Sequence, residues 1–128
     1  MGKIQVHIFD PVIYPRKVYI VKGKDLNNEI KDAFLTPDGY MLNTEGADAC
    51  RAGVWDVQLA EDKKLGVLIW LREQIDISVI AHESVHAANL VFRSCCIDYD
   101  TTHDEHFAHM VGWVADCVNQ VVTGKFKD

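Results

Sequence analysis

Residues 76–93 read DISVIAHESVHAANLVFR, and the expected fold is built around this stretch. Its apolar residues recur at spacings of three and four positions, the pattern of a helix with one face packed inward. These residues are Ile77, Ile80, Ala81, Val85, Ala88 and Phe92. Asp76 and Ser78 each offer a side-chain oxygen that can cap the first turn. The stretch therefore predicts a long amphipathic helix.

Strands are expected before this helix. Residues 54–60 (VWDVQLA) alternate in polarity, residues 65–71 (LGVLIWL) are almost wholly apolar, and EDKK joins them, so a β-hairpin is predicted. Residues 3–9 and 17–21 predict two further strands. Asp25 is expected to cap a short helix over residues 26–34, and residues 37–53 are expected to form a loop.

A second helix is expected over residues 103–122, because apolar residues again recur at helical spacing. The length of 128 residues, the hydrophobic content of 48% and the charged content of 25% suit a single globular domain over residues 1–128. The predicted fold class is α+β. A small mixed sheet packs on the helix over 76–93, and a second helix follows.

The composition argues against several kinds of partner. The net charge is −6 and no segment gathers Lys or Arg, so neither a nucleic acid nor an anionic membrane is expected to bind. No apolar run reaches the ~20 residues that span a bilayer, and no secretory signal is recognisable. The four cysteines form no Cys-x-x-Cys pair, and Cys95 and Cys96 are adjacent. We expect free thiols in a reducing cytoplasm.

His82, Glu83 and His86 form the pattern His-Glu-x-x-His. Residues four apart on a helix project from one face, about 6 Å apart along the axis, so two imidazoles can share one metal ion. Glu83 points about 100° around the helix from His82, where a general base for a water on the metal belongs. The alternative is two unrelated surface histidines on a helix.

A catalytic zinc site usually has three protein ligands and one open position. Glu105 lies nineteen positions after His86, at the start of the second expected helix, and is the leading candidate for the third ligand. His103 and His106 are rival candidates. His109 lies one turn after Glu105 on the same face, where it can ligate, hydrogen-bond a ligand or polarise a substrate carbonyl.

Thr102 and Glu105 also fit a capping box, in which Glu105 bonds its own backbone and touches no metal. Gly112 lies about two turns beyond Glu105 on the same face, so a close approach of the two helices is expected there. Asp76 and Asp116 are candidates to orient the imidazoles through hydrogen bonds.

The chain resembles the gluzincins, which are zinc metallopeptidases with a glutamate as third ligand. It is most similar to the minimal, single-domain zincins of phage and prophage origin. The resemblance rests on residues 82–87 (HESVHA), 105–108 (EHFA) and 112–113 (GW), and it covers roughly residues 54–118. Where such relatives often carry an aromatic hydroxyl after Glu-x-x-Ala, this chain has His109.

The resemblance implies a Zn²⁺-dependent peptidase acting on a peptide or protein substrate, in the cytoplasm of a phage-infected or lysogenic bacterial host. It implies His82, His86 and Glu105 as metal ligands and Glu83 as general base. It also implies an edge strand along the substrate cleft. Residues 65–71 fit that strand, whose exposed backbone can pair with an extended peptide.

Two other functions are left open by the sequence. The chain can be a non-catalytic zinc-bound module that acts in phage assembly or as a binding partner, with a closed ligand set. It can also be a metal-free helical protein in which Glu105 is only a cap. Zinc content, an open metal position and peptide cleavage distinguish the three.

Overall fold

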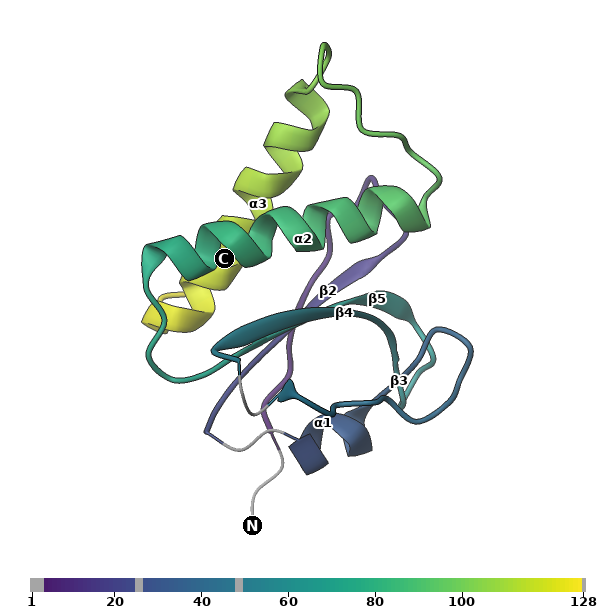
Figure 1. The fold of residues 1–128 in the computed structure, drawn as a ribbon, viewed down its shortest axis with the longest axis vertical. Helices are drawn as coiled ribbons and strands as arrows, with labels where there is room; N and C mark the ends of the chain where they lie inside the picture. The colour runs from purple at the N-terminus through teal and green to yellow at the C-terminus, as the bar shows by residue number, and fades with distance from the viewer. Residues whose placement is uncertain (1–3, 25–26, 48–49, 128) are drawn as a thin grey trace.

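The computed structural model describes residues 4–24, 27–47 and 50–127, which form a mixed sheet of five strands and three helices (Figure 1). The strands are β1 (His7–Phe9), β2 (Lys17–Lys22), β3 (Phe34–Leu35), β4 (Ala52–Leu59) and β5 (Leu65–Leu71). The helices are α1 (Asn27–Ala33), α2 (Ile77–Ser94) and α3 (Glu105–Thr123). The expected combination of a mixed sheet with helices is confirmed.

The strands lie in the order β1-β2-β5-β4-β3. β2 and β5 are parallel, and the other neighbours are antiparallel. The predicted hairpin of β4 and β5 is confirmed, with Gln58 opposite Leu65 at its closed end. β3 was not predicted, because it is only two residues long and pairs with just the last two residues of β4.

The expectation that residues 65–71 form an edge strand is wrong. β5 lies between β2 and β4, and every residue of it after Leu65 is buried. The physical reason is in its composition, since a continuous apolar run is typical of a strand covered on both faces. The exposed edge belongs instead to β4. Residues 52–57 pair with β5 on one side and, in the described part of the chain, with no strand on the other.

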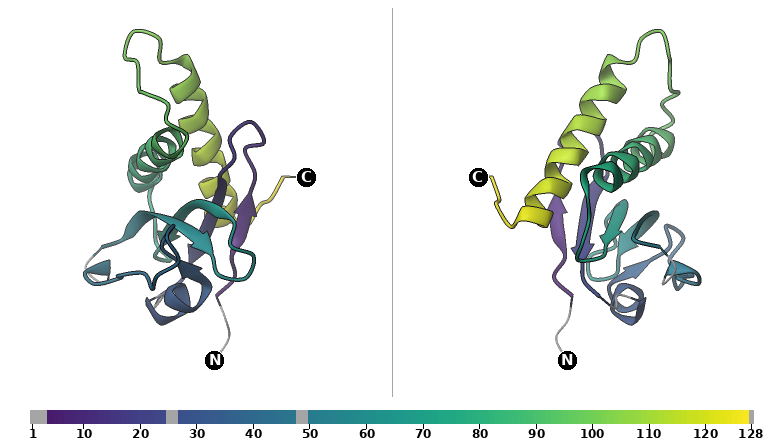
Figure 2. Two further views of the ribbon diagram at one scale, coloured as in Figure 1. Left: turned by 90° about the vertical axis from the view of Figure 1, so that its right-hand side faces the viewer. Right: turned by 60° about the vertical axis from the view of Figure 1, so that its left-hand side comes forward.

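The sheet separates two apolar cores (Figure 2). On one face, Val67, Ile69 and Leu71 of β5 pack with residues of α2 and α3. On the other face, Leu68 and Trp70 pack near α1 and the loop after it. The alternation along β5 follows from the pleat of a strand, which turns successive side chains to opposite faces.

α2 is the predicted helix, within a residue at each end. Asp76 is its N-cap, and Asp76 Oδ1 accepts a hydrogen bond from the Val79 N–H at 3.1 Å and from the Ser78 hydroxyl at 2.6 Å. These bonds satisfy a backbone donor that the first turn leaves without a helical partner. The metal motif is therefore carried by a capped helix.

α3 begins two residues later than predicted, and the capping-box alternative is wrong. Asp104 is the N-cap, so Glu105 is the first helical residue rather than the third. The Thr102 hydroxyl donates instead to Asp100 Oδ1 at 2.7 Å. Gly112 is exposed, and a Cβ placed on it would meet nothing within 4 Å. The close helix approach expected at Gly112 is therefore also wrong.

The remaining expectations differ in small ways from the structure. The strand predicted over residues 3–9 is seen as His7–Phe9, and the short helix as Asn27–Ala33. Asp25, the expected cap of that helix, lies outside the described residues. Among the described residues, no helix is both long enough and apolar enough to cross a membrane.

Candidate metal centre

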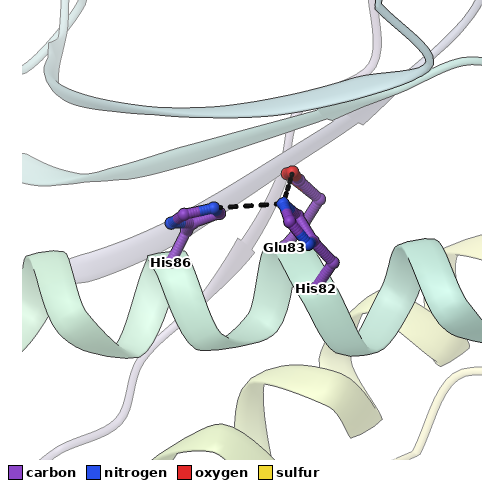
Figure 3. A group of neighbouring side chains, drawn as sticks. All are labelled: His82, Glu83 and His86. Carbon is purple, nitrogen blue, oxygen red and sulfur yellow. Dashed lines mark hydrogen bonds and ion pairs between the residues drawn. The ribbon is translucent and has the colours of Figure 1, made fainter.

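α2 displays His82 and His86 on its surface and turns Glu83 inward (Figure 3). The two Nε2 atoms lie 3.1 Å apart, and Glu83 Oε1 lies 3.9 Å from His82 Nε2. One nitrogen from each ring and one carboxylate oxygen all lie within 4.8 Å of one another. These three residues, called here the His-Glu-His group, could together hold a metal ion, although the sequence predicted only the two imidazoles as ligands from this motif.

The spacing of the two imidazoles suits a zinc ion. Two nitrogens that bind one tetrahedral zinc at ~2.0–2.1 Å lie about 3.3 Å apart. The 3.1 Å between His82 Nε2 and His86 Nε2 is close to that value. The His82 side chain is 69% exposed, so this side of the group is open to solvent and to a ligand.

Glu83 is the buried member of the His-Glu-His group. Its side chain is only 9% exposed, and its Oε2 has no hydrogen-bond partner among the described residues. A buried carboxylate oxygen without a donor is costly, because it has lost its water without compensation. A metal ion, or a proton on a water beside one, supplies the missing partner. Glu83 therefore fits a metal centre better than a structural role.

The two carboxylates expected to orient the imidazoles, Asp76 and Asp116, bind other partners. Asp76 caps α2, and its hydrogen bond from Ser78 is the first cause that lowers its pKa below the usual range. Asp116 accepts from Gln120 Nε2 at 3.0 Å and from Lys127 Nζ at 2.9 Å. Neither carboxylate contacts His82 or His86 in the part of the chain that the structure describes.

The structure does not bring Glu105 or its rivals to the His-Glu-His group. Glu105 Oε1 lies 3.2 Å from His109 Nε2, and both side chains are about four-fifths exposed (81% and 78%). His103 Nδ1 lies 3.0 Å from Asp100 Oδ2, and His106 is exposed. The only group of potential ligands found among the described residues contains no side chain from α3.

The arrangement of the helices explains this separation. The Phe92 ring of α2 packs 5.4 Å from the Phe107 ring of α3, so α3 lies on the Phe92 side of α2. Glu83 precedes Phe92 by nine positions and therefore points about 180° away around the helix. Figure 3 shows the His-Glu-His side chains on the strand side of α2, with α3 on the opposite side.

Asp56 of β4 is a further polar residue on this side of the sheet, and the sequence reading missed it. Ala52 and Val54 pack against the core beneath α2, and the strand alternation places Asp56 on the same face. Burial raises the pKa of Asp56, and the positive charges of Arg16 and Arg93 partly oppose that rise. The signal was present in the sequence, as a carboxylate at an inward-facing position of an alternating strand.

Comparison of the chain with known proteins finds no matching family, no matching curated protein and no matching solved structure.

Proposed function

We propose that this chain is a zinc-dependent peptide hydrolase with a zincin-like arrangement, in which His82 and His86 hold the metal and Glu83 is the general base. One observation carries the proposal. Two exposed imidazole nitrogens lie at a zinc-compatible 3.1 Å, beside a buried carboxylate whose Oε2 has no partner among the described residues. Neither a structural ion pair nor two unrelated surface histidines would require a buried carboxylate oxygen without a partner beside them.

The chemistry assigned to the chain is proton transfer. Zinc, when bound, supplies a Lewis acid for the carbonyl and a water of lowered pKa. Glu83 accepts a proton as the water oxygen bonds to the peptide carbon, and it returns that proton to the leaving amine as the C–N bond breaks. Its Oε1 lies 3.9 Å from His82 Nε2, which places a proton acceptor beside the imidazoles that would hold the metal.

The substrate side of the proposal concerns β4. Its outer edge over residues 52–57 has no strand partner in the described part of the chain, and α2 packs on the same strand. An extended peptide can add to such an edge through main-chain hydrogen bonds. The role first expected of residues 65–71 thus passes to β4, and the substrate class remains a peptide or protein.

A non-catalytic zinc module is the second candidate, and the position of Glu83 favours it in one respect. A carboxylate oxygen of Glu83 is itself close enough to both imidazoles to act as a third ligand. In that case a His₂Glu set forms within α2 and no base remains. The two functions therefore differ in what Glu83 does.

The test compares zinc content and peptide cleavage in four proteins: wild type, His86→Ala, Glu83→Gln and His103→Ala. His103 is the matched control, since it is an exposed histidine that pairs with Asp100. We expect His86→Ala to lose zinc, and Glu83→Gln to keep zinc while losing cleavage by about 10²-fold or more. Cleavage is followed by mass spectrometry on a mixture of unstructured peptides.

Each outcome discriminates. Equal zinc in wild type and His86→Ala would sink the metal assignment. Loss of zinc in Glu83→Gln would make Glu83 a ligand and favour the non-catalytic module. Unchanged cleavage in Glu83→Gln would show that another group is the base.

A further inference from the structure

We propose that a cavity of about 440 Å³ beside the C-terminal end of α2 binds a small phosphomonoester. The cavity lies between the connector over residues 10–16 and the β4–β5 turn over residues 60–64, and we call it the cationic cavity. Its charged lining consists of Arg16, Lys17, Lys63 and Lys64, with Asp10 as the one carboxylate. The inference is independent of the His-Glu-His group.

The lining of the cationic cavity contains four cations and one carboxylate, with Glu61 and Asp62 in the adjoining turn. Lys17 Nζ pairs with Asp10 at 2.8 Å, which accounts for the one carboxylate of the lining. The side chains of Lys63 and Lys64 have no ion pair among the residues that the structure describes. Asp62, next to them, accepts a hydrogen bond from the backbone N–H of Lys64. A net positive site is unexpected in a chain of net charge −6.

Arg16 is fixed in place by neutral partners. Its guanidinium donates to the Pro15 carbonyl at 2.8 Å and to the Ser94 carbonyl, at the end of α2, at 3.3 Å. Carbonyl oxygens orient a guanidinium without cancelling its charge, and that charge also acts on the Asp56 carboxylate of β4. A guanidinium held in this way presents a fixed donor fork of the kind that phosphate oxygens prefer.

Both walls of the cavity turn through unusual backbone. Val12 (φ 69°) and Lys63 (φ 63°) are two of the three non-glycine residues with positive φ in the described chain. A β-branched residue in this region is a genuine outlier. Asp10 Oδ1 holds the Val12 N–H at 2.8 Å, and the Leu59 carbonyl holds the Lys63 N–H at 2.8 Å. Such conformations gather at ligand-binding sites, where the surrounding structure maintains them.

Lys17 of the lining lies on a strand that packs closely against its neighbour. Lys17 and Gly66 are register partners on the parallel strands β2 and β5, and a Cβ on Gly66 would lie 2.4 Å from the Lys17 carbonyl. The Tyr14 ring packs 5.5 Å from Phe92, which ties the connector to α2. The cavity is therefore assembled from elements held at fixed spacing.

The lining also specifies the organic part of the ligand. The half-buried Tyr14 and Leu65 give the cavity an apolar side next to its cations. Its volume falls in the range of about 300–1,000 Å³ that is usual for small-molecule sites. A phosphate offers three acceptor oxygens to several separated donors, which a single carboxylate cannot match. The chemistry of the site thus fits a phosphate ester with a compact apolar group.

An anionic membrane surface is the competing occupant. Val12 and Ile13 are 83% and 78% exposed at the tip of the connector, beside the lysines. Exposed apolar residues with flanking cations are typical of membrane-surface contacts. The cationic cavity instead gathers Arg16 from the connector and Lys63 and Lys64 from the β4–β5 turn around about 440 Å³, which suits a small ligand that several donors contact at once.

The test is calorimetric titration of the intact chain at low ionic strength with phenyl phosphate and with inorganic phosphate. The variant is Lys63→Gln with Lys64→Gln. The matched control is Lys22→Gln with Lys125→Gln, which removes the same charge from two exposed lysines elsewhere. We expect phenyl phosphate to bind more tightly than inorganic phosphate, the variant to bind it at least tenfold more weakly, and the control to bind like wild type.

Circular dichroism checks that both double variants are folded. We expect the variant to fold, because the backbone carbonyl of Lys64, which accepts a hydrogen bond from the Tyr19 hydroxyl, is kept when the side chain is changed. Absence of saturable binding, or equal weakening in variant and control, overturns the proposal. Binding of inorganic phosphate but not phenyl phosphate overturns the assignment of an ester. Binding to phosphatidylserine vesicles without binding of phenyl phosphate assigns the site to a membrane surface and also overturns it.

Discussion

The residue that best separates a metal centre from a coincidence of surface histidines is Glu83. The His-Glu-x-x-His spacing alone predicts only that two imidazoles share a helix face. The structure adds that Glu83 is buried and that its Oε2 lacks a partner among the described residues. An unpaired buried carboxylate oxygen is the feature that a bound ion resolves and that a purely structural helix avoids.

Glu105 tests how far the zincin resemblance extends. We expect Glu105→Gln to leave zinc affinity within about threefold of wild type, because its carboxylate pairs with His109 and lies on the α3 side of α2. Competition with a fluorescent chelator measures the affinity, and His86→Ala is the positive control. A loss of ten- to a hundredfold, as expected for removal of a metal ligand or its close support, would show that Glu105 joins the site when zinc binds.

Asp56 makes a prediction about stability and pH. Burial raises its pKa in the folded state, so between the unfolded value of about 3.8 and the raised folded value the folded state binds more protons. Stability linked to Asp56 is therefore fully present below the unfolded pKa and is lost as pH rises through the folded pKa. We expect Asp56→Asn to be more stable than wild type at pH 7, with the difference shrinking towards pH 4.

Urea unfolding at the two pH values measures this difference. Asp38→Asn is the control, since Asp38 is an exposed aspartate in the loop after β3. An Asp56→Asn protein that is less stable than wild type at pH 7 would show that the attraction of Arg16 and Arg93 outweighs the burial of the carboxylate.

At the scale of elements, local patterns predicted most of the fold and long-range placement was the part they missed. The hairpin of β4 and β5 and the cap of α2 follow from alternation, from a polar turn and from Asp76, all within short windows. The central position of β5 in the sheet depends on its pairing with β2, which lies some fifty positions earlier in the chain. No local pattern encodes that pairing, so a central strand was mistaken for an edge.

The same distinction applies to the candidate site. His82, Glu83 and His86 sit within two turns of one helix, and their spacing alone brings them together. A ligand from α3 requires that the second helix pack on a particular side of the first. The Phe92–Phe107 contact places α3 on the other side, and the apolar stripes of the two helices do not specify which side is chosen.

Gly66, which is crowded, and Gly112, which is exposed, provide a prediction at the scale of elements in which each variant is the control for the other. A Cβ at Gly66 would lie 2.4 Å from the backbone carbonyl of Lys17, and neither strand can retreat within the sheet. We expect Gly66→Ala to lower the free energy of unfolding by roughly 1–3 kcal/mol, the usual cost of overpacking. Gly112 has open space around it in the middle of α3, so Gly112→Ala should raise stability by about 0.5–1 kcal/mol.

Urea unfolding of the two variants checks both signs at once. A Gly66→Ala protein as stable as wild type would mean that β2 and β5 are more loosely spaced than described. Destabilisation by Gly112→Ala would mean that another surface packs against that face of α3.

At the scale of the whole molecule, the sheet divides the helices between its two faces. α2 and α3 cover one face, with the histidine motif on α2, while α1 covers the other. The His-Glu-His group lies near the middle of α2, and the cationic cavity is tied to Ser94 at the end of α2 through Arg16. One helix thus supports both proposed sites, and each can be removed without the other.

Zinc binding should be visible in the stability of the whole chain. A ligand that binds only the folded state at a free concentration 100 times its Kd raises the free energy of unfolding by about 2.7 kcal/mol. We expect zinc to raise the thermal midpoint of wild type and of Glu105→Gln, and to leave the thermal midpoint of the His82→Ala and His86→Ala double variant unchanged.

Hydrogen exchange followed by mass spectrometry then locates the effect of zinc along the chain. If the His-Glu-His group alone holds the metal, zinc should protect the backbone amides around residues 82–86 and leave residues 105–109 as they were. Protection that extended to residues 105–109 would mean that zinc draws the first turn of α3 to α2. That result would restore Glu105 as the third ligand and make the described arrangement the metal-free state of the site.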